Sequence, residues 1–179
     1  DEQSYEEITQ VMRGKVSVTS GAIKKQGQTS QIKKNIRGVS DGIGILDGNP
    51  VSQSLFMELS AMDNLQMLLS HKVNGMWAVR RYRRRIRRLL SGILERRVYG
   101  RRVKDLGNAD IQRIAYCRWL IYSPDLLVCI QPFADGDIEA REAAREMIYI
   151  LENRRIPVLI ITSNSLEFNY CRGREVYMR

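Results

Sequence analysis

The sequence has 179 residues, of which 44% are hydrophobic and 27% are charged, and its net charge is +9. This composition is typical of a globular domain and excludes a disordered chain or a coiled coil. It contains no apolar run of the roughly 18 residues that a membrane-spanning helix requires and no recognisable signal peptide, so we expect a cytoplasmic protein.

The cysteines and the histidine form no recognisable metal or disulfide motif. Cys117, Cys129 and Cys171 are odd in number and widely spaced, which predicts small apolar side chains in a reducing compartment. His71 has no second histidine to complete a metal site, so we expect it at the surface. The sequence therefore predicts no metal ion held by these side chains.

The first fifty residues predict a helix followed by short strands. Residues 4–12 have apolar side chains on one helical face, and Gly14 is a typical helix stop. Residues 15–20 alternate as a strand does. Residues 22–38 have no strong period, so we expect a loop and a short helix, and residues 42–46 predict a short apolar strand that enters a tight loop.

The middle of the chain predicts helices only. Residues 60–69 repeat apolar side chains at helical spacing, with Ser60 and Asp63 as a capping pair. Residues 77–99 predict one long basic helix with an apolar stripe, and residues 110–122 predict a further helix. The stripe consists of Tyr82, Ile86, Leu89, Leu90, Ile93 and Leu94.

The last third of the chain alternates strands and helices. Residues 125–131 and 157–162 are continuous apolar runs that predict buried strands, and residues 138–153 predict a helix between them. A short helix near residues 166–170 and a last strand at residues 175–178 follow.

Buried strands that alternate with helices predict an α/β fold with a mostly parallel sheet. The helical middle of the chain interrupts this alternation, so it looks like an insertion. We therefore expect an α/β core from residues 1–50 and 113–179 and an inserted helical subdomain over residues 51–112.

Several segments, taken in order, are similar to the ATP-binding domain of ABC transporters. Residues 106–120 (LGNADIQRIAYCRWL) resemble the signature motif and its helix, and residues 123–137 (SPDLLVCIQPFADGD) resemble the Walker B segment and the D-loop. Residues 158–179 resemble the end of sugar-importer domains, residues 54–65 the segment after the Q-loop, and residues 7–14 the helix after the phosphate loop. The resemblance covers nearly the whole chain and is closest to the second nucleotide-binding half of simple-sugar and nucleoside importers.

The resemblance implies the P-loop NTPase-like core of an ABC ATPase, with ATP and Mg²⁺ as cofactors. Its phosphate loop falls on residues 1–6, which contain no glycine and no lysine, and their carboxylates would repel a polyphosphate. The phosphate-loop positions include Glu2, Ser4, Tyr5 and Glu6. Because the strand that precedes this loop in the family is missing, we expect the sequence to be part of a longer polypeptide.

The resemblance also assigns catalytic and interface positions to altered residues. Ile130 stands at the position of the Walker B aspartate that supports Mg²⁺, Gln131 at the catalytic carboxylate, and Ser163 at the switch histidine. Isoleucine cannot hold a metal's water shell, and glutamine cannot accept a proton. The signature-loop positions are Gly107, Asn108 and Ala109, and Asp137 is the D-loop aspartate. Asp137 equally fits a simple cap of the helix that follows it.

These features predict a degenerate domain that has lost hydrolysis. We expect it to act as the structural or regulatory half of a nucleotide-binding-domain pair. Its partners would be a second ABC ATPase domain and a membrane permease, at the inner face of the cell membrane. The alternative is an ABC-derived regulatory protein, detached from transport, that binds anionic lipid or nucleic acid.

The positive charge is concentrated in one segment. Residues 80–104 hold 12 of the 29 lysines and arginines and one acid, Glu95. The basic patch consists of Arg80, Arg81, Arg83, Arg84, Arg85, Arg87 and Arg88. It is compatible with a solvated helix face, with contact to anionic lipid headgroups, or with nucleic-acid binding aided by Tyr82 and Trp77, although no nucleic-acid motif accompanies it.

Overall fold

The structure is a computed structural model. It describes residues 2–17, 24–25, 28–29, 38–48, 55–71, 81–134, 137–164, 167, 173–174 and 176. None of the described helices is long and apolar enough to cross a membrane.

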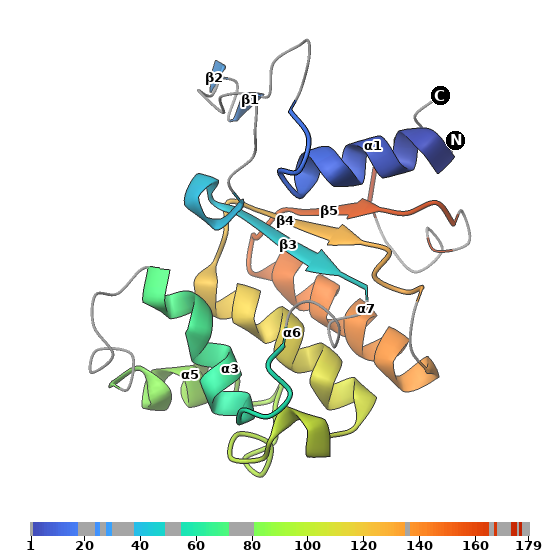
Figure 1. The fold of residues 1–179 in the computed structure, drawn as a ribbon. Helices are drawn as coiled ribbons and strands as arrows, with labels where there is room; N and C mark the ends of the chain where they lie inside the picture. The colour runs from blue at the N-terminus through green and yellow to red at the C-terminus, as the bar shows by residue number, and fades with distance from the viewer. Residues whose placement is uncertain are drawn as a thin grey trace.

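The centre of the fold is a parallel sheet (Figure 1). In the part of the chain that the structure describes, it contains β3 (Ile43–Asp47), β4 (Leu126–Ile130) and β5 (Val158–Ile161), in that order. Both strand pairs are parallel. The predicted α/β class and the parallel pairing are therefore confirmed, and the strands begin and end within one residue of the predicted ranges.

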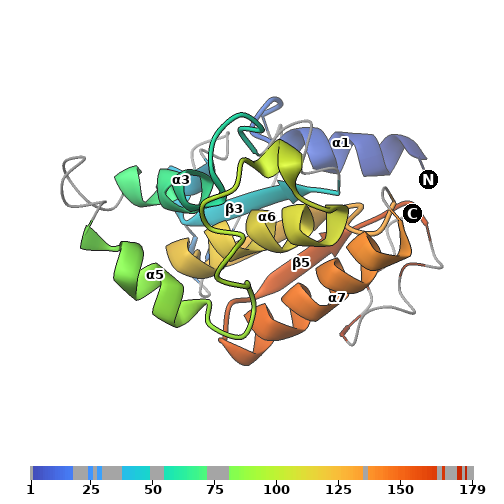
Figure 2. The ribbon, with the colours of Figure 1, turned by 90° about the horizontal axis from the view of Figure 1, so that it is seen from below.

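Helices cover both faces of this sheet (Figures 1 and 2). On one face, Val128 and Ile130 of β4 pack against apolar side chains of α1 (Glu2–Met12). On the other face, Leu127 and Cys129 belong to the larger core, to which α6 (Asn108–Tyr122) and α7 (Ile138–Asn153) contribute. Because successive side chains point to opposite faces and both faces are covered, every position of the strand interior is apolar.

The helical region contains α3 (Ala61–Gln66), the 3₁₀ helix η2 (Met67–His71), α5 (Arg83–Leu89) and the 3₁₀ helix η3 (Val103–Asp105). The predicted cap of α3 is confirmed, because the Ser60 hydroxyl accepts a hydrogen bond of 3.2 Å from the Asp63 N–H. The division of the chain into core and subdomain stays a prediction.

The long helix predicted at residues 77–99 is wrong in its second half. α5 ends at Leu89, and the chain then follows turns to residue 100. Gly92 has a φ of +92°, a backbone conformation that stops a helix and that glycine adopts without steric cost. The apolar stripe is nevertheless buried, since Ile86, Leu90 and Leu94 all belong to the core. Residues 77–80 lie outside the described part.

Several other expectations differ or are untested. Of the strand predicted at residues 15–20, residues 15–17 are exposed and form no strand, and residues 18–20 lie outside the described part. Within residues 22–38, predicted as a loop and a short helix, the structure has an antiparallel pair, β1 (Lys24–Lys25) and β2 (Gln28–Thr29). The 3₁₀ helix η1 (Gly38–Asp41) begins at the last residue of that range, and residues 22–23, 26–27 and 30–37 lie outside the described part. The elements expected at residues 166–170 and 175–178 lie almost entirely outside the described residues, as does the His71 side chain.

Candidate functional site

The carboxyl ends of β3, β4 and β5 meet at one edge of the sheet, because the strands are parallel. The amino end of α1 lies on the same side of the molecule (Figures 1 and 2). This edge is where the fold gathers Ile130, Gln131 and Ser163, the three positions that the resemblance assigns to the chemistry. We call it the sheet edge.

Hydrogen bonds of Gln131 and of the neighbouring Ile130 connect the three strands at the sheet edge. Its side-chain amide donates a hydrogen bond of 3.1 Å to the Ser163 hydroxyl, and its backbone N–H donates to the Ile161 carbonyl at 2.8 Å. Gly48, after β3, donates its N–H to the Ile130 carbonyl. A Cβ at Gly48 would lie 1.8 Å from the Gln131 carbonyl oxygen, so this close approach requires glycine.

Ile130 does not face the open side of the sheet edge. Its side chain is 2% exposed and packs in the apolar cluster beneath α1. This position supplies no oxygen ligand, and among the described residues no group of three or more His, Cys, Asp or Glu side chains could hold a metal ion.

The phosphate-loop positions are helical in the structure. Ser4, Tyr5 and Glu6 lie inside α1, which begins at Glu2. Tyr5 is half-buried and packs against the sheet, and burial raises the pKa of its hydroxyl. These residues therefore form a turn of helix over the sheet and no loop that could surround a phosphate chain.

Charged side chains gather around Tyr5 at the sheet edge. Arg13 pairs with Asp47 at the end of β3, with 2.5 Å between nitrogen and oxygen. Glu167 is 4% exposed, and burial raises its pKa, while the Thr162 hydroxyl lowers that pKa by a smaller amount. Sequence analysis missed Arg13 and Asp47. Arg13 directly follows α1 and Asp47 is the last residue of β3, and neither position belongs to a recognised motif.

The signature and D-loop positions are in direct contact. The Asn108 amide donates a hydrogen bond of 2.9 Å to one oxygen of Asp137, and the Ala140 N–H donates to the other oxygen at 2.8 Å. These donors, Ala140 first and Asn108 second, lower the pKa of Asp137. Asp137 thus caps α7 and joins it to the first residue of α6. Gly107 and Ala109 flank Asn108 at this helix start.

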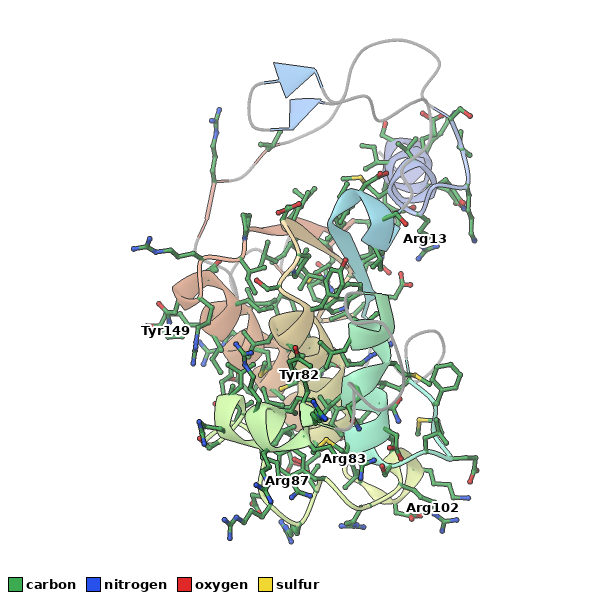
Figure 3. All side chains as sticks on the ribbon, turned by 90° about the vertical axis from the view of Figure 1, so that its left-hand side faces the viewer. Arg13, Tyr82, Arg83, Arg87, Arg102 and Tyr149 are labelled. Carbon is green, nitrogen blue, oxygen red and sulfur yellow. The ribbon has the colours of Figure 1, made fainter. Side chains whose placement is uncertain are left out.

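The arginines of the basic patch lie on the outside of α5. Arg81, Arg83, Arg84, Arg85, Arg87 and Arg88 are all exposed, and Arg80 lies outside the described residues. Arg83 pairs with Asp63 at 3.1 Å, and the Arg87 guanidinium lies 5.8 Å from the centre of the Tyr99 ring. Figure 3 shows Arg83 and Arg87 on the same side of the molecule as Arg102.

The described cysteines behave as small apolar residues. Cys117 and Cys129 are free and buried, and burial raises the pKa of the Cys117 thiol. Both belong to the main core, and Cys171 lies outside the described residues.

Comparison with curated proteins finds relatives among sugar importers, although no protein-family model matches the sequence. The ribose import ATP-binding protein RbsA of Yersinia pestis is 26% identical over 163 residues, which are 88% of this chain and 32% of that protein. RbsA 2 of Escherichia coli O157:H7 is 24% identical over 97% of this chain and 35% of its own length. The galactose/methyl galactoside import ATP-binding protein MglA of Clostridium tetani is 23% identical over 90% of this chain and 33% of its length. The chain thus spans about a third of these relatives.

Solved structures with the same fold are ABC cassettes. CbiO1 of Clostridium perfringens, part of the ABC transporter complex cbiONQ, matches with a TM-score of 0.71 and 17% identity, over 93% of this chain and 65% of that one. The ADP conformation of MJ1267, an ATP-binding cassette of an ABC transporter, matches with a TM-score of 0.69 and 16% identity, over 92% of this chain and 68% of that one. The chain therefore has the fold of ABC ATPase cassettes and is distantly related to the ATP-binding proteins of sugar importers.

Proposed function

We propose that this chain is a degenerate ATP-binding-cassette domain of a sugar- or nucleoside-type importer. It acts as the structural or regulatory half of a pair of nucleotide-binding domains and does not hydrolyse ATP. Within it, residues 1–50 and 113–179 form the core and residues 51–112 the helical subdomain. It works at the cytoplasmic face of the membrane.

The observation that carries this proposal is the hydrogen bond between Gln131 and Ser163 at the sheet edge. A hydrolytic site needs a group here that orients water or accepts its proton. The Gln131 amide instead donates to a neutral hydroxyl, and neither partner can act as a general base at neutral pH. This bond occupies one donor of the Gln131 amide and one acceptor site of the Ser163 hydroxyl.

The residues at this edge do not fit Mg²⁺ and ATP. Ile130 is buried under α1, so β4 presents no carboxylate to a metal ion. The positions assigned to the phosphate loop belong to α1, and their bulky side chains replace the glycines that allow close backbone approach to phosphates. The Asp47 carboxylate is already paired with Arg13.

A dimer with a second ABC ATPase domain is the partnership we propose. The amino ends of α1, α6 and α7 lie on one side of the molecule, and Asn108 and Asp137 hold the latter two ends together (Figures 1 and 2). This supports a preserved interface surface. MJ0796, a solved cassette with a TM-score of 0.58, is a dimer with ADP and phosphate, and cbiO1 is part of a larger complex, which supports a permease as further partner.

A second candidate function is that of an ABC-derived regulator detached from transport. The exposed arginines of α5 favour it, because no catalytic role explains them. An intact ATPase half in the same polypeptide, or a permease gene next to its gene, would favour the importer function over that of a detached regulator.

Calorimetric titration of the chain with ATP, with and without Mg²⁺, tests whether the sheet edge binds this nucleotide. We expect no Mg²⁺-dependent heat of binding. A control titration with Gln131→Ala should be indistinguishable from that of the native chain. Stoichiometric Mg²⁺-dependent binding that Gln131→Ala weakens would show that the sheet edge still holds the nucleotide.

A further inference from the structure

Four exposed arginines form a row along α5, which we call the arginine row. Arg81, Arg84, Arg85 and Arg88 follow the i, i+3, i+4, i+7 spacing that brings side chains to one face of a helix. Arg81 precedes α5 in helical conformation, and Tyr82 between them has helical dihedrals. The row is about 10 Å long, from the rise of 1.5 Å per residue.

The arginine row is fixed in its outward orientation. Ile86 and Leu90, on another face of the same segment, are 2% and 0% exposed and anchor it to the core. Arg83, beside the row, is held by Asp63. The segment therefore cannot rotate to hide the row without exposing core side chains.

The row differs from neighbouring basic residues because it has no acidic partner among the described residues. Nearby, Arg97 pairs with Glu95 at 2.6 Å, and Arg102 pairs with Asp105 at 3.0 Å. Like charges at these helical spacings repel and destabilise a helix. Negative charges placed against the row would attract each arginine and offset the repulsion among them. The row is therefore suited to a partner that carries many negative charges.

The surroundings of the row argue against insertion into a bilayer and against stacking on bases. Within residues 81–134, no large hydrophobic side chain is exposed, so the segment has nothing to insert into a bilayer or to stack on a base. Tyr99 is 3% exposed, and Tyr82 is partly buried with the Arg85 guanidinium 6.0 Å from its ring centre. Single-stranded nucleic acids need free aromatic faces, whereas adsorption to anionic headgroups needs charge alone.

The position of the row leaves it free when the proposed dimer forms. α5 lies at the opposite end of the molecule from the amino ends of α1 and α7 (Figures 1 and 2). We propose that the arginine row binds the surface of an anionic phospholipid bilayer by electrostatic attraction, without insertion. This inference rests on the proposed function, which places the chain beneath a membrane.

Co-sedimentation with vesicles of phosphatidylcholine and phosphatidylglycerol tests this inference on the native chain. A variant with Arg81, Arg84, Arg85 and Arg88 changed to glutamine should bind about 600-fold more weakly, because each basic residue near an anionic surface adds about a fivefold factor. A control variant of equal net charge carries Arg97→Gln, Arg102→Gln, Arg113→Gln and Arg145→Gln, all at residues with acidic partners. Because its net charge equals that of the row variant, it should lose much less affinity than the row variant if the row, and not the overall charge, makes the contact with the vesicle.

Circular dichroism on both variants checks that they are folded, and the row variant should melt no lower than the native chain because its self-repulsion is gone. Binding should also weaken steeply when salt is raised to about 0.5 M. Equal binding to pure phosphatidylcholine, undiminished binding by the row variant, or tighter binding to duplex DNA than to the anionic vesicles would overturn the inference. Vesicle binding involves no nucleotide. A failure to bind vesicles would therefore contradict the role of the arginine row without affecting the ATP calorimetry, and a positive ATP titration would contradict the proposed function without affecting vesicle binding.

Discussion

Glu167 is a buried carboxyl group at the sheet edge, and its protonation is coupled to folding. Burial raises its pKa above the ordinary value of 4.5. The folded protein therefore binds a proton at this group more readily than the unfolded chain does. Consequently, the stability that this group contributes falls as the pH rises from about 4.5 through the folded-state pKa.

Replacement of Glu167 by glutamine removes this pH dependence. We expect the melting temperature of Glu167→Gln, relative to that of the native chain, to rise between pH 5 and pH 7.5, because the native chain alone must bury a charge there. Thermal melts at both pH values measure the difference. Glu152→Gln, at an exposed position of α7, controls for the loss of one acidic side chain. A difference that is constant, or that shrinks as the pH rises, would contradict this assignment.

Residue identities at the sheet edge could be predicted from the sequence, but their contacts could not. The positions of Gln131 and Ser163 follow from the ends of two recognisable strands. Their mutual hydrogen bond depends on the left-handed backbone of Gln131, with φ of 48°, which no sequence pattern indicated. The Arg13–Asp47 pair joins residues 34 positions apart and arises only from the packing of α1 over β3.

At the scale of elements, the contact between β3 and α6 depends on one glycine. A Cβ on Gly44 would lie 2.7 Å from Cε3 of Trp119, closer than carbon atoms approach. Gly44→Ala should therefore reduce the free energy of unfolding by about 1–3 kcal/mol, the usual cost of overpacking a core. Urea unfolding measures this loss. Gly100→Ala is the matched control, because nothing lies within 4 Å of its Cβ position. Equal stability of the two variants would mean that β3 and α6 are not packed this closely.

Elements with a continuous apolar run were predicted well, and those with an ambiguous period were not. β4 follows directly from such a run, and α7 follows from apolar residues at clear helical spacing after the Asp137 cap. α5 was predicted too long because its apolar stripe continues at helical spacing through Ile93 and Leu94, although both side chains reach the core from turns after Gly92. The spacing of apolar side chains predicts which residues are buried, but it does not by itself predict whether the backbone there is a helix or a series of turns.

At the scale of the whole molecule, two surfaces lie at opposite ends. The amino ends of α1 and α7 adjoin the sheet edge, and α5 lies at the far end (Figures 1 and 2). On the function proposed above, a second ATPase domain occupies the first surface while the arginine row contacts lipid. On the same proposal, the Asn108–Asp137 contact holds the starts of α6 and α7 together at this first surface.

Mg²⁺-dependent ATP turnover tests the central claim most directly. The loss of a general base alone typically slows a reaction by about 10²–10⁴-fold, and here the position of the metal-supporting carboxylate is a buried isoleucine as well. Phosphate release by the native chain should equal that of a protein-free blank, and Gln131→Ala should change nothing. Turnover by the native chain that requires Mg²⁺ and disappears in Gln131→Ala would contradict the account.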